Sequence, residues 1–278
     1  MSTSPTIGFI GAGNMASAII GGMLDSGFRA GGIWVSAPDD KHLQTIRNKF
    51  GVSVTTDNRY CAQQADLLIL AVKPQIMAEV CGDIAPVVQN TRPLMVSIAA
   101  GLTADTLDHW LGGGLPLVRV MPNTPSLVGM GAAGLFANDQ VSDEQKNTVE
   151  SIFDSIGKAL WVEDENQLHA VTALSGSGPA YFFLMLEALE TAAGEAGIPA
   201  ETARGLAIQT MAGAAEMAAR SEHDPAQLKR NVMSPGGVTE QAIHTFEDGG
   251  LRPLVGKAYK AAMSRSREMA KELADGKQ

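Results

Sequence analysis

The first residues with ligand-binding chemistry form a glycine-rich turn, Gly11-Ala12-Gly13-Asn14-Met15-Ala16, between an apolar run and an amphipathic stretch. In this G-x-G-x-x-A spacing, Gly11 permits a tight turn, Gly13 lets a pyrophosphate approach the backbone, and Ala16 lets the next helix pack closely on the strand. The start of that helix offers N–H groups and the positive end of its dipole to the pyrophosphate. The turn therefore predicts a dinucleotide cofactor; the alternative is a glycine turn that binds no ligand.

The end of the second expected strand bears on the choice between NADP and NAD. An acidic residue at this place would bond the ribose 2′-hydroxyl and repel a 2′-phosphate. The chain instead has Ser36, which is neutral and can donate a hydrogen bond. Asp39 and Asp40 come slightly later, with Lys41 beside them. We expect a preference for NADPH, with NADH also accepted; the alternative for Ser36 is an ordinary turn residue.

Three further turns follow expected strands, at the edge where doubly wound sheets bind ligands. They are Ala71-Val72-Lys73-Pro74, Ile98-Ala99-Ala100-Gly101 and Met121-Pro122-Asn123-Thr124-Pro125. Each turn could hold a nicotinamide ribose or a substrate. Lys73 is a lone cation in such a turn, and a solvated lysine is an equally good interpretation.

Two turns rich in Gly and Ser lie in the C-terminal half of the chain. They are Ser175-Gly176-Ser177-Gly178 and Ser234-Pro235-Gly236-Gly237-Val238-Thr239. Each precedes an expected helix, and so offers backbone N–H groups and a hydroxyl that suit a carboxylate. Helix capping is the better interpretation of one such turn alone. Two of them, in a chain that also carries a nucleotide motif, favour a substrate site.

Other chemistries lack their residues. The histidines form no metal-ligand pair at HxxxH or HxH spacing, so we expect no metal site. The chain has no C-x-x-C motif and no G-x-S-x-G elbow. Metal-dependent hydrolysis, thiol redox chemistry and serine hydrolysis are therefore not expected. The five histidines are His42, His109, His169, His223 and His244.

Charge and cysteine content indicate the partners and the compartment. The net charge of −9, without a long basic run, argues against a nucleic-acid partner. The two cysteines, Cys61 and Cys81, are too few for a disulfide framework and are typical of reduced thiols in a cytoplasmic protein. We expect no signal peptide, because the first residues lack a charged region followed by an apolar one. No apolar run reaches the roughly 18 residues of a membrane helix.

The elements that must position these turns alternate between short apolar runs and helical stretches up to about residue 163. Runs such as LLILAV suit strands that are buried on both faces of a parallel sheet. Strand–helix alternation predicts an α/β Rossmann fold, doubly wound around a mostly parallel sheet, over residues 1–163. Expected strands are 6–10, 33–36, 52–55, 67–72, 94–98, 117–121, 132–136 and 159–163, and expected helices include 14–25, 75–88 and 142–156.

From residue 164 to 278 the β signal is absent, and we expect an all-α domain. Pro and Gly separate its helical stretches, as helix starts and stops require. The stretch after Pro179 is apolar almost all round, which is typical of a helix buried by its own domain or by a partner subunit. We therefore expect at least a dimer. The expected helices are 179–195, 200–220, 225–232, 237–247 and 253–273.

Five sequence motifs together resemble pyrroline-5-carboxylate reductases: IGFIGAGNMA, AVKPQ, VMPNTP, LSGSGPAY and, above all, KRNVMSPGGVTEQAI. The resemblance covers the chain from Ile7 to about Lys271, and its last two motifs are the most specific. It implies a Rossmann domain followed by a helical substrate-binding and dimerisation domain. It also implies a homodimer, and in this family dimers often assemble into decamers of five dimers.

The resemblance also assigns binding roles to individual residues. Substrate contacts carry over to the second Gly-Ser turn and to Glu165, and the first Gly-Ser turn lies in the same neighbourhood. The substrate residues are Glu165, Ser175, Gly176, Ser177, Gly178, Ser234, Gly236, Gly237, Val238 and Thr239. The cofactor residues are Ile10, Gly11, Ala12, Gly13, Asn14, Met15, Ser36, Ala37, Asn58, Ala71, Val72, Lys73, Pro74, Ile98, Ala99, Ala100 and Asn231. The segment VSAPDD varies within the family, so cofactor preference is the weakest of these transfers.

The activity that the resemblance implies is the reduction of 1-pyrroline-5-carboxylate to L-proline, the last step of proline biosynthesis. The cofactor carries the hydride, and the protein must position it. Backbone N–H groups from Gly237 to Thr239 would fix the substrate carboxylate, and the Thr239 hydroxyl is the candidate to bond the ring nitrogen. A protonated imine needs no strong protein acid. Glu165 could reach the substrate through water, or could equally be a carboxylate at a helix start.

Two other functions deserve comparison. Reductases of the β-hydroxyacid dehydrogenase type carry a catalytic lysine a few turns after an SG turn. This chain has no lysine between Lys158 and Lys229. A non-catalytic NADP-binding protein would be marked by a damaged SPGGVT turn, and here the turn is intact.

Overall fold

The computed structural model describes residues 5–274 and divides the chain into two compact units. The first unit runs as far as Ser177 and also takes in the chain from Ala262 onward, and the second unit is Gly178–Ala261. These units are defined by contacts, whereas the division after residue 163 rests on the end of the β signal. The domain boundary of the sequence analysis therefore stays a prediction.

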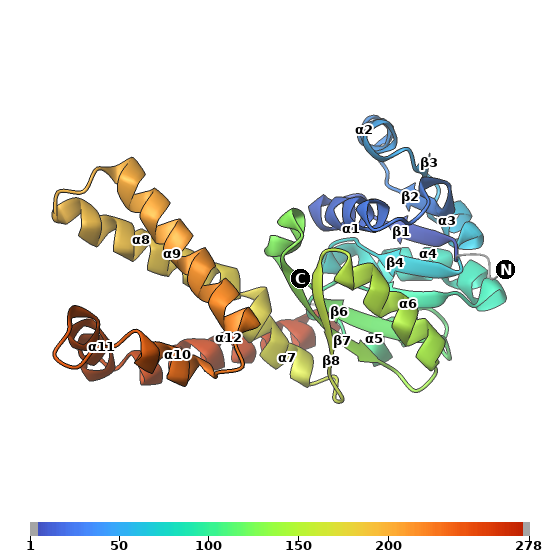
Figure 1. Ribbon diagram of the computed structural model, residues 1–278. Helices are drawn as coiled ribbons and strands as arrows, with labels where there is room; N and C mark the ends of the chain where they lie inside the picture. Colours follow the sequence, from blue (N-terminus) through green and yellow to red (C-terminus); the bar gives the residue numbers. More distant parts are fainter. Residues whose placement is uncertain (1–4, 275–278) are drawn as a thin grey trace. The chain divides into compact units, whose positions relative to one another are not determined.

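The first unit is built on one eight-stranded sheet (Figure 1). Its strand order is β3-β2-β1-β4-β5-β6-β7-β8, and every neighbouring pair is parallel except β6 and β7. The predicted doubly wound, mostly parallel sheet is confirmed. The strands are β1 (Ile7–Ile10), β2 (Ile33–Ser36), β3 (Ser53–Thr55), β4 (Leu67–Leu70), β5 (Leu94–Ser97), β6 (Leu117–Met121), β7 (Gly131–Ala137) and β8 (Gly157–Trp161).

Two apolar clusters hold helices against the two faces of this sheet. On one face, α1, α2 and α6 pack on side chains such as Phe9 and Val96. On the other, α3, α4 and α5 pack on side chains such as Leu68 and Met95. Burial of each large apolar side chain contributes about 1.5–3 kcal/mol to stability. The helices of this unit are α1 (Asn14–Asp25), α2 (Asp40–Phe50), α3 (Asn58–Gln64), α4 (Pro74–Thr91), α5 (Ala104–Trp110), α6 (Asp143–Asp154) and α7 (Gln167–Val171), with single 3-10 turns η1 (Ala30–Gly32) and η2 (Thr124–Val128).

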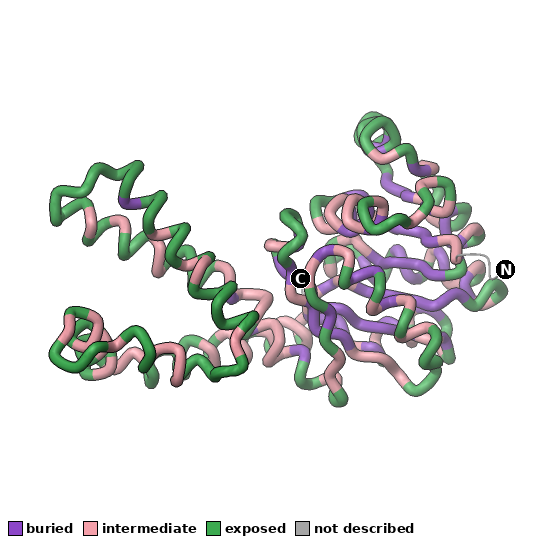
Figure 2. The backbone as a smooth tube through the Cα atoms, in the orientation of Figure 1, coloured by how far each residue is buried: buried purple, intermediate pink, exposed green. Residues whose placement is uncertain are grey.

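The second unit contains only helices among its elements. Figure 2 shows that its surface is mostly exposed or half-buried, in contrast to the buried strands of the sheet. On α8, the apolar side chains of Phe182, Phe183 and Leu184 are 60%, 65% and 66% exposed. A single copy of the chain thus leaves this apolar helix uncovered. The helices that begin in this unit are α8 (Gly178–Glu195), α9 (Ala200–Arg220), α10 (Pro225–Asn231) and α11 (Val238–Asp248); α12 (Leu251–Ala274) begins here and ends in the first unit.

None of the helices within residues 5–274 combines the length and the apolar character that crossing a bilayer requires.

Candidate active site

The glycine-rich turn has the geometry that its spacing predicts. It joins β1 to α1, and Gly11 has a φ of +105°, a conformation that favours glycine. A Cβ atom on Gly11 would lie 2.5 Å from the carbonyl oxygen of Ala71, so no larger residue fits. Gly13 is the N-cap of α1, and a Cβ there would meet no atom within 4 Å. No side chain caps α1, so its first N–H groups face open space that suits a pyrophosphate.

Three of the predicted turns meet at one edge of the sheet. They follow β1, β4 and β5, which are neighbours in the sheet, and the strand order reverses between β1 and β4. Hydrogen bonds join successive strand ends: the Ala71 N–H donates to the Ile10 carbonyl (2.8 Å), and the Ile98 N–H donates to the Leu70 carbonyl (3.2 Å). A crevice outside the strand ends at such a reversal is where α/β sheets bind nucleotides. Lys73, in the second of these turns, is exposed and is the N-cap of α4.

Ser36, at the end of β2, does not present its hydroxyl as a hydrogen-bond donor to a ribose phosphate, in contrast to the expectation. Ser36 is fully buried, and its hydroxyl donates to the Asn58 side-chain oxygen at 2.7 Å. Asp39 is the N-cap of α2, where its carboxylate accepts from the N–H groups of Lys41 and His42. The Ser36 hydroxyl is therefore engaged inside the protein, and an NADPH preference cannot rest on it in this conformation. The role of Ser36 and Asn58 in cofactor binding stays a prediction.

The sequence analysis weighed His42 only as a metal ligand and missed its contact with the glycine-rich turn. The His42 Nε2 atom lies 2.7 Å from the Ala12 carbonyl oxygen. A carbonyl oxygen only accepts, so the Nε2 atom carries the proton in this contact. His42 and Asn14 also line an open groove of about 810 Å³ beside α1 and α2. The contact joins residues 30 apart in the chain, and no local pattern announces it.

The first Gly-Ser segment does precede a helix, α8, which begins at Gly178, but the prediction that Ser175 and Gly176 form a turn is wrong. Residues Thr172–Gly176 form a π-helix, η3, between α7 and α8, and the Ser177 N–H donates to the Thr172 carbonyl at 2.8 Å. The Ser175 hydroxyl donates to the Val171 carbonyl at 3.1 Å. The helix thus uses the Ser177 N–H and the Ser175 hydroxyl, two of the groups that the prediction left open for a carboxylate. The substrate role of these residues stays a prediction. It now rests on the π-helix, because single π-helical turns often mark functional sites.

Asn123, from a turn predicted to hold a ligand, instead fixes this π-helix. Its side-chain NH2 donates to the Ser175 carbonyl (3.0 Å), and its side-chain oxygen accepts from the Ala132 N–H (2.9 Å). Asn123 is 8% exposed. A Cβ on Gly176 would lie 2.7 Å from the terminal methyl of Met121, which explains the small residue at this point.

The second Gly-Ser turn does precede a helix, as predicted. Gly237 is the N-cap of α11, and no side chain caps the helix. The Gly237 N–H donates to the Ser234 carbonyl (2.9 Å), and the Gly236 N–H donates to the Glu240 carboxylate (2.7 Å). The groups left for a ligand are the N–H groups at the start of α11. Thr239 is half-buried and lies inside the helix, so it is not the N-cap.

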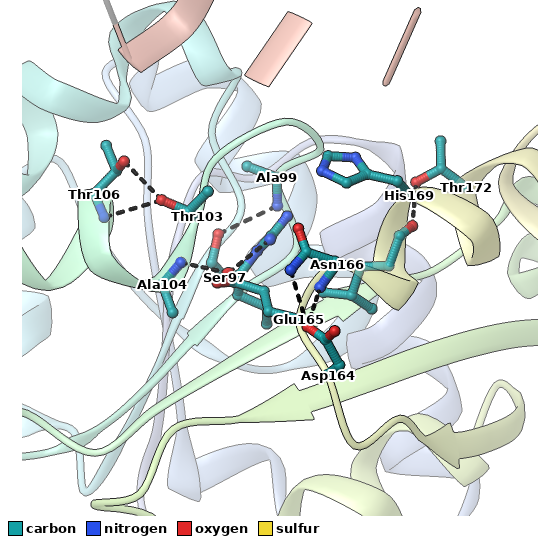
Figure 3. Close-up of polar contacts among 12 residues, drawn as sticks. Ser97, Ala99, Thr103, Ala104, Thr106, Asp164, Glu165, Asn166, His169 and Thr172 are labelled. Atoms are coloured by element: carbon teal, nitrogen blue, oxygen red, sulfur yellow. Dashed lines mark hydrogen bonds and ion pairs between the residues drawn. The ribbon is translucent and has the colours of Figure 1, made fainter. Parts of the chain in front are cut away.

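Glu165 lies in a compact polar cluster of the first unit (Figure 3). Its Oε1 atom accepts from the Ala104 N–H at the start of α5 (2.5 Å) and from the Arg119 guanidinium (2.8 Å). The Arg119 side chain is 8% exposed and that of Glu165 22%. Glu165 is thus a carboxylate at a helix start, as one of its two interpretations held. The helix start that Glu165 contacts, however, belongs to α5, and Ala104 lies 61 residues before Glu165 in the chain.

His169 extends this cluster toward α12. Its Nδ1 atom lies 2.9 Å from the Ser266 hydroxyl. Burial, helped by the nearby positive charges of Arg119 and Arg267, lowers the pKa of His169 below its usual 6.5, while the negative charge of Glu165 acts in the opposite direction. His169 therefore favours the neutral form. Within the described residues, the Arg119 Nε atom is buried without a hydrogen-bond partner.

The sequence analysis also missed Arg119, although a signal was present. The residue interrupts the apolar run LVRVM, which was assigned to a strand of the mostly parallel sheet. A charged residue at such a place needs a partner, because an unpaired charge is costly to bury. The partner itself, Glu165, is distant in sequence and could not be read from the motif.

The predicted site residues belong to both units. The glycine-rich turn, the strand-end turns and Glu165 lie in the first unit, and so do Ser175, Gly176 and Ser177. Gly178, Asn231 and the SPGGVT turn lie in the second. Among the described residues, no group of three or more His, Cys, Asp or Glu could hold a metal ion.

Comparison with known families matches both parts of the chain. Residues 6–101 match the family model described as NADP oxidoreductase, coenzyme F420-dependent. Residues 165–269 match the model for pyrroline-5-carboxylate reductase dimerisation, so this part of the chain is of a kind that forms oligomers.

Individual relatives match nearly the whole chain. A pyrroline-5-carboxylate reductase of Pseudomonas aeruginosa is 47% identical over 98% of this chain and 99% of its own length. The solved structure of one from Coxiella burnetii is 45% identical and superimposes with a TM-score of 0.93 over 96% of this chain and 99% of that one. The Plasmodium falciparum enzyme, solved with NADP bound, is 32% identical with a TM-score of 0.84 over 96% and 98%. With the glycine-rich turn and the uncapped SPGGVT helix start in place, these matches show that the chain belongs to the pyrroline-5-carboxylate reductase family.

Proposed function

We propose that this protein reduces 1-pyrroline-5-carboxylate to L-proline with NAD(P)H, the last step of proline biosynthesis. The observation that carries the proposal is the 47% identity to a reductase of this name over nearly the full length of both chains. The geometry supports it, because a nucleotide turn and a second uncapped helix start are both present. A β-hydroxyacid dehydrogenase would need a lysine in the helical half that this chain lacks between Lys158 and Lys229.

The residues of the first unit fit a nicotinamide dinucleotide. Gly13 leaves open space in front of the first N–H groups of α1, where the pyrophosphate would bind. The turns after β4 and β5, including Ala71, Val72, Ile98 and Ala99, would border the rest of the cofactor. Asn231 of α10 is carried over from the family. The bound cofactor supplies the hydride.

The residues around SPGGVT would bind and orient the substrate. The N–H groups of Val238 and Thr239 would hold its carboxylate, because those of Gly236 and Gly237 already have partners. The Thr239 hydroxyl, which is not the cap of α11, would accept the N–H of the protonated imine and would donate to the ring nitrogen once hydride transfer gives the forming amine a lone pair. The imine reaches the site already protonated from water, which makes it a better hydride acceptor and removes the need for a strong protein acid.

We further propose that the preferred cofactor is NADPH. The working form would be a dimer joined through the second unit, with dimers further assembled into a decamer. The enzyme would act in the cytoplasm. The dimerisation match over residues 165–269 and the exposed apolar side chains of α8 support the dimer. The buried, unpaired thiols of Cys61 and Cys81 suit a reducing compartment.

The direct test is oxidation of NADPH by the purified protein in the presence of pyrroline-5-carboxylate, followed by identification of proline. Matched reactions contain a 3-hydroxyacid and NADP⁺ in place of the imine and NADPH, and measure oxidation, which is the reverse direction. Proline formation is the expected result. Oxidation of a hydroxyacid without reduction of the imine would overturn the proposal.

A further inference from the structure

The imidazole of His42 makes a contact with the nucleotide turn that the mechanism above does not use. His42 is the third residue of α2, and its Nε2 atom lies 2.7 Å from the carbonyl oxygen of Ala12, in the middle of the glycine-rich turn. The backbone N–H of His42 donates to the Asp39 carboxylate, which caps α2 (3.3 Å). The helix start that carries the ring is therefore fixed, and the ring donates from it to the turn.

This contact determines which way the peptide group between Ala12 and Gly13 points. The peptide bonds within residues 5–274 are all trans, so the Ala12 carbonyl and the Gly13 N–H point in opposite directions. Because the carbonyl is directed at His42, the Gly13 N–H is directed away from it. Ala12 is 6% exposed, whereas Gly13 and Asn14 are exposed. The carbonyl is thus engaged by the protein, while the residues that lead into α1 stay open to a ligand.

The same peptide group has little else to hold its orientation. Rotation of a peptide group changes ψ of the residue before it and φ of the residue after it, and Gly13 tolerates a wide range of φ. A Cβ on Gly13 would meet no atom within 4 Å, so packing at this position does not restrain the peptide. A reversed peptide would present a carbonyl oxygen where an N–H group stood, and this oxygen would repel a pyrophosphate. The bond from His42 opposes that reversal.

We propose that His42 is a positioning residue for the pyrophosphate of the cofactor. By holding the Ala12 carbonyl, its Nε2–H keeps the turn in the orientation in which Gly13 and the start of α1 present N–H groups to the phosphates. This inference rests on the proposed function, which places a nicotinamide dinucleotide over the turn. His42 acts through its N–H donor and not through a charge, because a donor is all that a carbonyl oxygen requires.

The pyrophosphate is common to NADP⁺ and NAD⁺, which separates the proposed role of His42 from other roles. A residue that positions the turn affects the affinity for both cofactors by a similar factor. A residue that binds the additional phosphate of NADP⁺ affects the affinity for NADP⁺ alone. A residue with only a structural role lowers the melting temperature and leaves both dissociation constants unchanged.

The experiment compares His42→Ala, His42→Asn and His42→Gln with the wild-type protein and with Gln44→Ala. The glutamine side chain is long enough to keep an N–H donor near the place of the histidine Nε2 atom, whereas asparagine is one methylene shorter. Gln44 is exposed on the same helix and provides the control substitution. Dissociation constants for NADP⁺ and NAD⁺ are measured by calorimetry without substrate. Hydrogen exchange, followed by mass spectrometry, reports the amides of residues 11–16.

We expect His42→Ala and His42→Asn to raise both dissociation constants by a similar factor, between about threefold and about tenfold, which corresponds to the loss of one hydrogen bond. Exchange in residues 11–16 of the free protein becomes faster. The KM for NADPH rises, while kcat at saturating NADPH stays within a factor of about two, because the pyrophosphate is bound equally in the ground state and in the transition state. His42→Gln and Gln44→Ala stay within about twofold of the wild-type dissociation constants.

Three results would overturn the inference. One is an unchanged pair of dissociation constants in His42→Ala, or in His42→Asn if the alanine variant does not fold. Another is a loss of NADP⁺ affinity alone, which would make His42 a direct contact of the additional phosphate. The third is a His42→Gln variant as weak as His42→Ala, which would show that the ring or its charge is required.

The same measurements keep this inference apart from the proposed function. Cofactor binding is measured without turnover. A wild-type protein that binds NADP⁺ but does not reduce the imine would therefore refute the proposed function and leave the role of His42 to be judged separately.

Discussion

Gly11 and Gly13 provide a paired test of the nucleotide turn, because an added methyl group meets different surroundings at the two positions. At Gly13 the φ is −73°, and a Cβ would meet no atom within 4 Å. At Gly11 the φ is +105°, and a Cβ would lie 2.5 Å from the Ala71 carbonyl oxygen. Gly13→Ala should therefore disturb only a bound ligand, and Gly11→Ala should also disturb the protein.

The magnitudes follow from these surroundings. At the N-cap, Ala is less favourable than Gly by up to about 1 kcal/mol. Reduced freedom of the unfolded chain offsets about 0.4–1 kcal/mol of this. The free energy of unfolding of Gly13→Ala should thus stay within about 1 kcal/mol of wild type. In Gly11→Ala, the alanine must adopt a left-handed conformation, which costs about 1–2 kcal/mol, and its Cβ also collides with the backbone. The free energy of unfolding should therefore fall by at least about 2 kcal/mol.

The assay combines urea unfolding with calorimetric titration of NADP⁺. Gly13→Ala should keep its unfolding midpoint and lose at least about tenfold in NADP⁺ affinity, equivalent to about 1.4 kcal/mol. Gly11→Ala should lose both stability and binding. If Gly13→Ala binds NADP⁺ as tightly as the wild type, the pyrophosphate does not pass over this turn, and the placement of the cofactor is refuted.

Four further predictions concern other parts of the chain. Thr239→Ala should lower kcat by about 10²-fold, because it removes a hydrogen bond that strengthens in the transition state, whereas Thr239→Ser should retain much of the activity; unchanged kcat in the Ala variant would remove Thr239 from the mechanism. The lowered pKa of His169 means that the unfolded state binds more protons as the pH falls through its ordinary value of about 6.5, so stability should fall below that pH. His169→Gln should show a smaller drop in melting temperature between pH 7 and pH 5, and an equal drop would exclude His169 as the cause. Light scattering at micromolar concentration should show at least a dimer, because α8 exposes large apolar side chains, and a fully active monomer would contradict this. Finally, kcat/KM should favour NADPH over NADH; a clear NADH preference would point to Asp39 or Asp40 as the residues that govern the ribose pocket.

The sequence was informative wherever a short spacing decides the backbone. The fingerprint at Gly11 and Gly13 dictates a strand, a turn and a helix start within a few residues, and the structure has all three. The SPGG turn before α11 is a similar case, because a glycine N-cap leaves helix N–H groups open. Buried apolar runs likewise identified all eight strands, with ends that differ by no more than two residues.

Contacts between distant residues explain what could not be predicted. The segment at Ser175 and Gly176 reads locally as a turn, yet Asn123 and Met121 hold it as a π-helix from another element. The pairing of Ser36 with Asn58 is equally silent in the sequence, because it depends on how β2 and α3 meet.

The ion pair of Arg119 and Glu165 joins residues 46 apart in the chain. Only the unusual charge within a buried strand hinted that Arg119 had a partner. Neither residue type indicates by itself whether the carboxylate meets a substrate or a helix start. The structure shows the contact with a helix start, and the substrate contact of Glu165 stays a prediction.

The most direct test of the central claim uses NADPH that carries deuterium at the nicotinamide C4 position, in the transferable orientation. The purified protein is incubated with pyrroline-5-carboxylate, and the product is analysed by mass spectrometry and NMR. The proposed function predicts proline with a single deuterium on C5, since hydride passes directly from the cofactor to the imine carbon. Proline without deuterium, or oxidation of the cofactor without formation of proline, would contradict it.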